Sequence, residues 1–186
     1  MISFSSRKEY AKCLSNFSLL PIIIDNNEYY DTAEHYFHGK KYALLSEYCR
    51  DQERKKQMMD YSKTFQKGGG IVTPSDAKRK GGKNGFPLSD KELEMWDNLS
   101  IKVQNFICDY KVKTYPEVRE VLKETQSKLL IHPAFRCKDE DIKNRKWEGR
   151  LIVNELGKPE VIGGNMLGNI WMEIRTKLAV NFINIL

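Results

Sequence analysis

The sequence lacks long apolar runs and paired cysteines, and each absence excludes a class of protein. No apolar run approaches the roughly 18 residues that a membrane span needs. The four cysteines are far apart and form no C-x-x-C, which argues against a zinc framework or a disulfide scaffold; they are Cys13, Cys49, Cys108 and Cys137. The opening MISFSSRKEY lacks the basic and then apolar layout of a signal peptide. We therefore expect an intracellular, cytoplasmic protein with free thiols.

Common catalytic and nucleotide-binding motifs are missing as well. The sequence contains no P-loop, no G-x-G-x-x-G and no G-x-S-x-G. Its three histidines, His35, His38 and His132, do not form H-E-x-x-H, and no further ligands accompany them at metal-binding spacing. We expect neither a metal nor a cofactor.

The patterns that are present predict a single domain over residues 1–186, of the α+β class and mainly α-helical. A chain of 186 residues, 40% of them apolar and 30% charged, suits one globular domain with a real core. Strand and turn residues predict hairpins at 21–30 and 150–164 and a short strand at 128–133. Periodicity and capping residues predict helices at 31–63 (broken near 39–42), 74–80, 90–113, 116–126 and 166–186.

The stretch DTAEHYFHGKKY, residues 31–42, places Glu34, His38 and Lys41 on one helix face, at positions i, i+4 and i+7. Asp31 is a candidate N-cap with Glu34 three residues later, and this capping-box pattern accounts for Glu34 without any catalysis. A carboxylate held at a helix N-terminus beside aromatic side chains is also a useful acid or base. Both interpretations stay open at this level.

Lys41 also allows two interpretations, because lysines on helix faces are commonly solvated. Lys41 follows Lys40, however, and precedes the apolar run YALL. A neighbouring ammonium group and burial each lower the pKa of an amine. An amine that is neutral part of the time attacks a carbonyl or the C1 atom of a sugar and forms an imine.

Residues 63–83 form a basic, glycine-rich segment. Its cations, opposed within the segment only by Asp76, are Lys63, Lys67, Lys78, Arg79, Lys80 and Lys83. The segment is either a solvated loop or a surface that attracts phosphate, on a nucleotide or on a nucleic acid.

The stretch IGGNMLGNIWMEIR, residues 162–175, places Gly164, Asn165 and Gly168 at a helix start, with Asn165 as the expected N-cap. Backbone N–H groups there suit an anion or a ribose hydroxyl. An ordinary capped core helix explains the same residues equally well.

Three separated segments form an ordered set: LSNF (14–17) with the hairpin after it, AEHYFHGKKY (33–42) and GGNMLGNIWMEIR (163–175). This set resembles the NADAR family, the YbiA-like N-glycosidases, whose pattern runs S-N-F, S-E-H-Y-F-Q-A-x-K-F and G-x-N-x-L-G-x-x-L-M-E-x-R. TPSDAKRKG (73–81) resembles the family's T-P-x-E-A-K-x-x-G. The helix that carries Trp96 and Lys111 resembles its tryptophan helix. The resemblance extends over nearly the whole chain.

The resemblance implies an enzyme that cleaves the N-glycosidic bond between ribose and a base, as in riboflavin-pathway intermediates or ADP-ribosylated guanine. It implies that Lys41 attacks C1 of the ribose and forms a Schiff base while Glu34 moves protons. Partners would be a ribosylated small molecule or an ADP-ribosylated nucleic acid, with no membrane and no metal. Residues expected to bind the substrate are Asn16, Phe17, Tyr36, His38, Trp96, Trp147, Asn165 and Gly168.

The sequence departs from the family pattern at several positions. His38 replaces the glutamine of E-H-Y-F-Q, Asn144 replaces an acidic residue, and a longer stretch replaces a glycine-rich turn after Trp147. Two alternatives follow. One is a nucleotide or ADP-ribose binding module that is catalytically weak, in which Lys41 is exposed or ion-paired. The other is a nucleic-acid-binding protein that uses residues 63–83, with affinity that falls steeply with salt.

Overall fold

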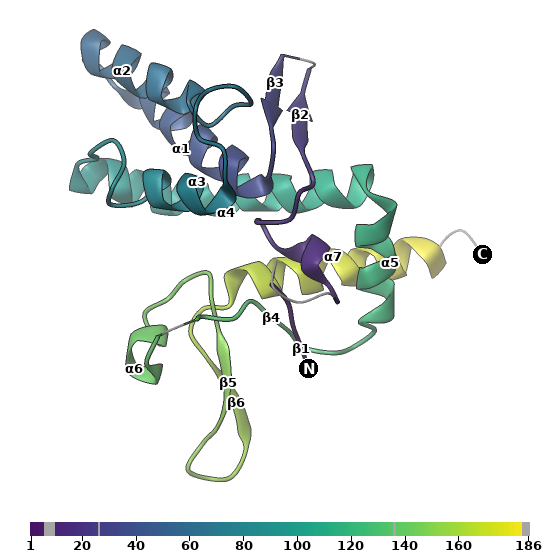
Figure 1. Cartoon of the computed structure of the whole chain (residues 1–186). Helices are drawn as coiled ribbons and strands as arrows, with labels where there is room; N and C mark the ends of the chain where they lie inside the picture. Colours follow the sequence, from purple (N-terminus) through teal and green to yellow (C-terminus); the bar gives the residue numbers. More distant parts are fainter. Residues whose placement is uncertain (6–9, 26, 136, 184–186) are drawn as a thin grey trace. The chain divides into compact units, whose positions relative to one another are not determined.

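The structure, a computed structural model, describes residues 1–5, 10–25, 27–135 and 137–183. The chain divides into two compact units, one of residues 16–111 and one formed by residues 1–15 together with 112–186. Both are mainly helical and carry small two-stranded sheets, which confirms the α+β, mainly α-helical class (Figure 1). A single domain over residues 1–186 stays a prediction.

The unit of residues 16–111 combines a short hairpin with helices. Strands β2 and β3 pair antiparallel, with Ile22 opposite Tyr30, and helix α1 packs against α2, α3 and β3. The predicted hairpin and helices of this unit are therefore present. The bounds are β2 (Ile22–Ile24), β3 (Glu28–Tyr30), α1 (Ala33–Tyr48), α2 (Gln52–Lys63), α3 (Pro74–Gly81) and α4 (Asp90–Thr114), the last ending in the other unit.

Helices α1, α2 and α3 each begin at a side chain that accepts a hydrogen bond from the backbone N–H three residues later. The three N-caps are Thr32, Asp51 and Thr73. Such a cap satisfies a backbone donor that has no partner within the helix. The expected N-cap Asp31 was wrong by one residue, because the Thr32 hydroxyl makes this bond instead.

Helix α1 continues through Gly39, where a break was expected, and ends at Tyr48. A Cβ atom on Gly39 would lie 2.8 Å from Cε1 of Tyr30 and 3.3 Å from Cβ of Phe65. Gly39 therefore allows a close approach between α1 and its neighbours and does not interrupt the helix. The interruption comes after Tyr48, and Asp51 caps the next helix.

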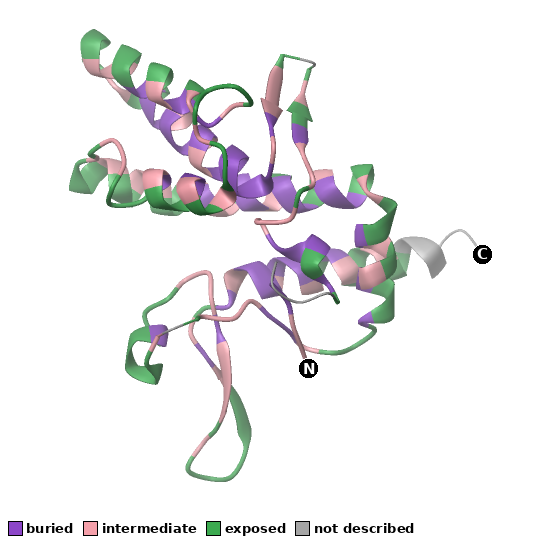
Figure 2. Cartoon of the chain, in the orientation of Figure 1, coloured by how far each residue is buried: buried purple, intermediate pink, exposed green. Residues whose placement is uncertain are grey.

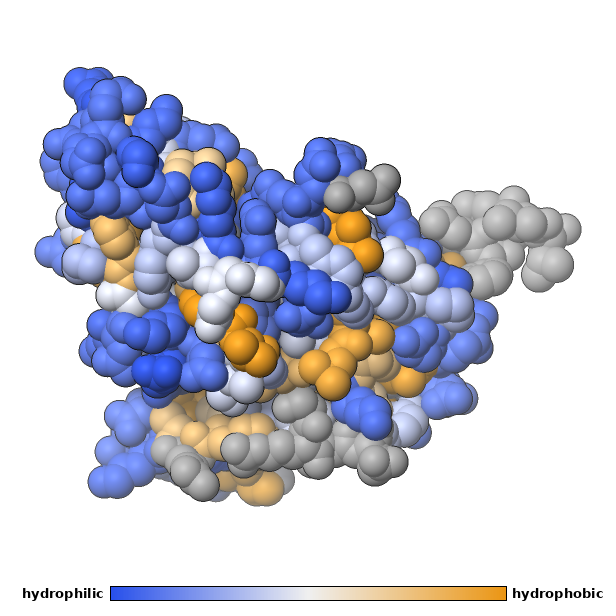
Figure 3. Space-filling view, turned by 45° about the horizontal axis from the view of Figure 1, so that its top comes forward, coloured by the Kyte–Doolittle hydropathy of each residue, from blue (hydrophilic) through white to orange (hydrophobic). Residues whose placement is uncertain are grey.

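The core of this unit lies along α1 and is rich in aromatic side chains. Figure 2 shows α1 buried over most of its length, whereas α2 beside it is largely exposed. Tyr42 is fully buried and stacks on Phe65, with the ring centroids 5.9 Å apart. Figure 3 shows hydrophilic residues where α2 lies, at the upper left. The two helices therefore differ in exposure although they pack together.

In the other unit, α7 packs against α5 and against strand β4, which forms a short parallel pair with β1. Trp171 of α7 is fully buried, and its indole Nε1–H donates to the Leu14 carbonyl at 3.0 Å. The predicted hairpin at 150–164 is present as β5 and β6. The bounds are β1 (Ile2–Ser3), the 3-10 helix η1 (Lys12–Leu14), α5 (Pro116–Glu124), β4 (Leu130–Ile131), α6 (Asp139–Ile142), β5 (Arg150–Val153), β6 (Pro159–Ile162) and α7 (Met166–Ile183). The predicted continuation of α7 over residues 184–186 lies outside the described residues.

Within the described residues, none of the helices combines the length and the apolar character that a membrane crossing requires.

Candidate active site

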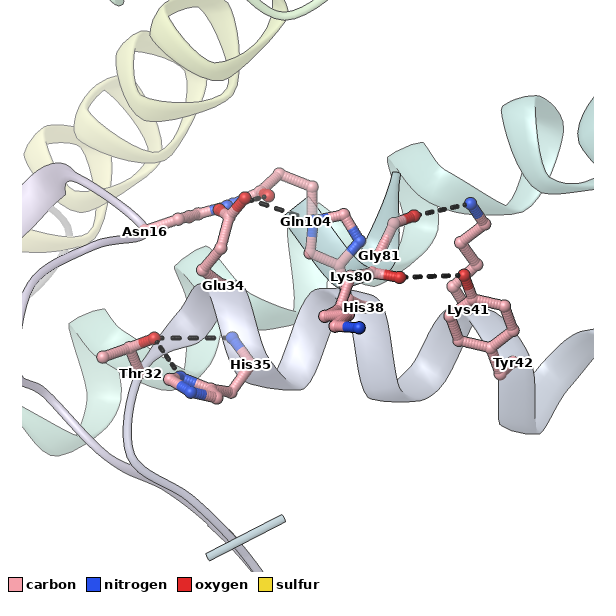
Figure 4. Close-up of polar contacts among 10 residues, drawn as sticks. All are labelled: Asn16, Thr32, Glu34, His35, His38, Lys41, Tyr42, Lys80, Gly81 and Gln104. Carbon is pink, nitrogen blue, oxygen red and sulfur yellow. Dashed lines mark hydrogen bonds and ion pairs between the residues drawn. The ribbon is translucent and has the colours of Figure 1, made fainter. Parts of the chain in front are cut away.

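Helix α1 presents Glu34, His38 and Lys41 on one side, as the spacing predicts. Figure 4 shows the three side chains extending from the same side of the helix, with His38 between the other two. Glu34 is 8% exposed and Lys41 is 6% exposed, so both charged groups are largely removed from water. Burying charged groups costs free energy, and functional sites commonly contain such groups. This row of side chains is the candidate active site.

Glu34 lies in the first turn of α1, but with Thr32 as the N-cap the capping-box position falls on His35, one residue after Glu34. Its Oε1 atom lies 3.2 Å from Nε2 of His38, one helical turn further on. The capping-box explanation for Glu34 therefore does not hold. The contact between Glu34 and His38 lies on the side of α1 that also carries Lys41.

The amine of Lys41 is held by a neutral acceptor. Its Nζ donates to the Gly81 carbonyl at 3.0 Å and lies 5.3 Å from the centre of the Tyr42 ring. Burial lowers the pKa of Lys41 to about 8. Lys40 is not the cause, since its own ammonium group lies 2.9 Å from the Glu28 carboxylate. Burial alone therefore raises the neutral fraction of this amine near physiological pH.

Gly81, the last residue of α3, contacts two members of the row. Its carbonyl accepts the hydrogen bond from Lys41, and a Cβ atom at this position would lie 2.0 Å from Nδ1 of His38. Any side chain at residue 81 would therefore displace the His38 ring. Sequence reasoning did not select Gly81, although it is the final residue of the family-like TPSDAKRKG segment.

Asn16 lies at the start of α1, where its carbonyl accepts a hydrogen bond from the backbone N–H of Glu34 at 3.0 Å. Its side-chain amide forms a reciprocal pair with Gln104, at 2.8 and 3.1 Å (Figure 4). Gln104, from α4, was not predicted. The sequence feature that could have identified Gln104 is its position as a polar residue beside Val103 and near Ile107, which lie on the buried side of α4.

The predicted aromatic site residues of this unit lie in ring contacts. Tyr36 is buried and stacks on Phe106 with the centroids 5.4 Å apart. Trp96 is half-buried and meets Phe37 edge-on at 4.9 Å. Phe17 is also half-buried, with Nζ of Lys78 5.9 Å from its ring centre. A role for Phe17, Tyr36 and Trp96 in binding substrate stays a prediction.

His35 is the second histidine of α1 and is almost fully buried. Its Nδ1 atom lies 2.8 Å from Oγ1 of Thr32, and burial lowers the pKa of the ring. This histidine is therefore neutral at physiological pH and supports the start of the helix.

Trp147, Asn165 and Gly168 belong to the other unit. Asn165 directly precedes α7, as expected of its N-cap, and its carbonyl accepts from the Asn169 N–H at 2.9 Å. Its side chain bridges to the chain at β4: Nδ2 donates to the Leu130 carbonyl at 2.9 Å, and Oδ1 accepts from the His132 N–H at 3.0 Å. Asn165 has φ 46°, in the left-handed region that asparagine tolerates.

The position of Gly168 against β4 leaves no space for a side chain. A Cβ atom there would lie 2.3 Å from the Leu130 carbonyl oxygen. Trp147 is half-buried, and its carbonyl lies 3.2 Å from Nδ1 of His132. The contacts of Asn165 and Gly168 are thus structural, and substrate binding by Trp147, Asn165 and Gly168 stays a prediction.

The basic segment of residues 63–83 is partly compensated by local contacts. Arg79 pairs with Asp76 at 2.8 Å, and Lys63 lies 3.5 Å from Asp60. Nζ of Lys67 lies 4.4 Å from the centre of the Tyr29 ring. The surface therefore carries less uncompensated charge than the sequence indicates, and binding of phosphate or nucleic acid there stays a prediction.

Lys111 of α4 is a second buried lysine. Its side chain is fully buried, and its Nζ donates to Oγ of Ser18 at 3.0 Å. Sequence reasoning noted Lys111 only as part of the tryptophan helix. Unlike Lys41, it does not belong to the row on α1, but its burial makes it an alternative nucleophile that an experiment must separate from Lys41.

Among the described residues, histidine, cysteine, aspartate and glutamate form no group of three or more that could hold a metal ion. The row on α1 itself offers an amine, a carboxylate and an imidazole. These groups support nucleophilic and acid–base steps at a polarised carbon atom.

Comparisons with known proteins identify the family of the chain. The NADAR domain model matches residues 3–179, so the chain belongs to the NADAR domain family. Among solved structures, the chain is similar to the NMR structure of the E. coli protein YbiA, with a TM-score of 0.58 and 24% identity; the match covers 98% of this chain and 86% of that one. A comparison with curated proteins gives no match.

Proposed function

We propose that this protein is an N-glycosidase that hydrolyses the bond between ribose and a base, with Lys41 as the nucleophile. The observation that carries the proposal is the buried amine of Lys41, whose pKa is lowered to about 8, on the same side of α1 as the Glu34 carboxylate. Membership of the NADAR family supports the same reaction class. The substrate would be a ribosyl phosphate or an ADP-ribosyl group on a base, in a small molecule or in nucleic acid.

The lowered pKa supplies a reactive amine at the pH of a cell. At pH 7.5 about a quarter of Lys41 is neutral, whereas about 0.1% of an exposed lysine would be. The neutral amine is the form that attacks carbon, because its lone pair is available. The Gly81 carbonyl accepts one N–H of this amine and so orients it.

In the proposed reaction, Nζ of Lys41 forms a bond to C1 of the ribose as the bond from C1 to the base nitrogen breaks. The electron pair of that bond goes to the base, which takes up a proton. The ring bond between C1 and its oxygen then opens, the oxygen is protonated, and C1 remains joined to Lys41 as an iminium. Water adds to C1, the bond to Nζ breaks, and the free sugar and the amine are released.

Each of these steps moves a proton, and Glu34 is the proposed group that moves it. The carboxylate takes the proton that the attacking amine loses and returns it to the base or to the ring oxygen. General acid–base groups of this kind contribute about 10²- to 10⁴-fold to a rate. We therefore expect Glu34→Gln to lower turnover within that range while leaving Lys41 in place.

The alternative of a catalytically weak binding module predicts that Lys41 is exposed or held in an ion pair. Lys41 is instead buried and hydrogen-bonded to a neutral carbonyl. This contact favours the enzyme over the binding module, because an ion pair would keep the amine protonated.

The test is a borohydride trap. The protein is incubated with ADP-ribosylated guanine DNA or with a ribosylamine phosphate, the reductant is added, and peptide mass spectrometry locates the added mass. We expect the adduct on Lys41, and we expect it to be absent in Lys41→Ala.

The matched control is Lys40→Ala, which removes the neighbouring amine that pairs with Glu28 and should leave the adduct unchanged. An adduct on Lys111 would transfer the nucleophile to that residue. Turnover without any adduct would exclude the imine step, and the absence of both turnover and adduct would favour the binding module.

A further inference from the structure

The two ring nitrogens of His38 have different surroundings. Nε2 lies 3.2 Å from Oε1 of Glu34, whereas Nδ1 is buried and has no hydrogen-bond partner. The backbone of Gly81 lies on the Nδ1 side, so close that a Cβ atom there would be 2.0 Å from Nδ1. Figure 4 shows the ring between Glu34 and Gly81. One nitrogen therefore faces a carboxylate and the other faces a carbon atom of the main chain.

This asymmetry distinguishes the two tautomers of the neutral ring. A neutral imidazole has one N–H donor and one bare acceptor nitrogen. A proton on Nε2 gives the Glu34 carboxylate a donor and leaves the bare nitrogen next to carbon. A proton on Nδ1 would bury an unpaired N–H against Gly81 and set the Nε2 lone pair against a carboxylate oxygen, and both arrangements cost free energy.

We propose that His38 is the positioning residue of Glu34: its Nε2–H tautomer donates a hydrogen bond to Oε1 and fixes the carboxylate on the side of α1 that also carries Lys41. Gly81 selects this tautomer because it offers Nδ1 neither a donor nor an acceptor. The proposal deepens the proposed function and rests on it, since Glu34 needs a fixed position only if it moves protons in the reaction.

A glutamine in place of His38 can also donate a hydrogen bond to the Glu34 carboxylate. Its terminal amide carries N–H donors at the end of an unbranched side chain and does not titrate. Glutamine is also the residue at the corresponding position of the family pattern. If the function of His38 is to donate one hydrogen bond to Glu34, His38→Gln retains it, whereas His38→Leu removes the donor and keeps a similar volume.

The experiment has a spectroscopic arm and a kinetic arm. Long-range ¹H–¹⁵N NMR of the uniformly labelled full chain at pH 8 identifies which imidazole nitrogen carries the proton. The chain has only three histidines, so the loss of one set of signals in His38→Gln assigns the ring. We expect a protonated Nε2 and a bare Nδ1.

The kinetic arm uses whichever substrate is turned over in the trapping experiment. We expect His38→Leu to lower kcat by about 10- to 100-fold with little change in KM, as for the loss of a hydrogen bond to a charged group. His38→Gln should stay within about threefold of the wild-type kcat. Circular dichroism confirms that each variant is folded, and His38→Met replaces His38→Leu if the latter does not fold.

A proton on Nδ1 in the spectrum would overturn the proposal, and so would a glutamine variant as impaired as the leucine variant. The expected spectrum together with rescue by glutamine supports it, because a merely structural role would not depend on a donor. If wild-type protein turns over neither substrate, the proposed function fails, while the spectrum still decides the tautomer.

Discussion

Helices α1 and α2 follow one another in the chain and pack together. They differ in the exposure of their charged side chains and in the groups that these side chains contact. On α2, Lys56 pairs with Asp60 at 2.8 Å, and both side chains are at least half exposed. On α1, Glu34 and Lys41 are buried, and the Lys41 amine is held by a carbonyl. Exposed pairs contribute little to stability, whereas a buried amine without a counter-ion lowers it.

Charged residues therefore have different roles in α1 and α2. The charges of α2 keep an exposed helix in water, as the pattern of hydrophilic residues in Figure 3 indicates. The charges of α1 are buried, where they cost free energy, and such burial is common where a charged group performs chemistry. Substitutions of the buried charges of α1 should therefore change both stability and activity, whereas substitutions of the exposed charges of α2 should change neither measurably.

The largest expected effect is on turnover in Lys41→Met, a variant that keeps the length of the side chain and removes the amine. If Lys41 is the nucleophile, turnover should fall by at least about 10³-fold, because the covalent path is lost. Steady-state kinetics on the substrate of the trapping experiment measure this loss. Lys40→Met is the matched control, and an equal loss in both variants would contradict the assignment.

The second expected effect is a dependence of stability on pH that is specific to Lys41. Its pKa is about 8 in the folded chain and near 10.5 when exposed, so between these values the unfolded state binds more protons, and stability must rise with pH. Relative to Lys41→Met, the free energy of unfolding should increase by about 2 kcal/mol between pH 8 and pH 9.5.

Urea denaturation of both proteins across this range tests the second prediction. The difference between wild type and Lys41→Met cancels the titration of the tyrosines, since both proteins contain the same ones. Parallel pH curves for the two proteins would show that the amine is not buried in solution.

The third expected effect comes from Gly81→Ala, which adds a Cβ atom 2.0 Å from Nδ1 of His38. The His38 ring must move away, and we expect a loss of about 1–3 kcal/mol from overpacking together with reduced turnover. The matched control is Gly82→Ala, where the nearest atom to a Cβ would be the Lys78 carbonyl oxygen at 3.2 Å. Thermal unfolding and kinetics of both variants provide the comparison, and equal effects would exclude a specific role for Gly81.

The smallest expected effect is at Lys56→Ala on α2. Lys56 and its partner Asp60 are exposed, and exposed ion pairs of this kind contribute little. We expect no resolvable change in the midpoint of thermal unfolding and no change in turnover. A clear loss of activity in this variant would show that the proposed distinction between the two helices is wrong.

The sequence predicted the positions of most elements and the common side of Glu34, His38 and Lys41, because both depend on spacing within a few residues. It placed the start of α1 one residue early, since Asp31 and Thr32 are both good caps and only the side-chain hydrogen bond distinguishes them. It also expected Gly39 to break α1, because its packing against Tyr30 depends on a contact that local propensity does not contain.

The remaining features of the site depend on contacts between distant parts of the sequence. Lys41 is held by Gly81, which is 40 residues away in the chain, and Asn165 bonds to Leu130, 35 residues away. Asn165 lies directly before α7, as expected, but the hydrogen bonds of its side-chain amide to Leu130 and His132 were not predicted. No periodicity or capping rule predicts such pairs: the sequence pointed to Lys41 and Asn165 but not to their partners Gly81 and Leu130.

The buried, hydrogen-bonded amine of Lys41 also matters for pharmacology. Exposed lysines are almost fully protonated at neutral pH and so react slowly with carbonyl compounds. An aryl aldehyde forms an imine preferentially with an amine of lowered pKa, and Lys41 has a pKa of about 8. We therefore expect an aryl aldehyde to form a reversible imine with Lys41 in preference to the exposed lysines of the chain.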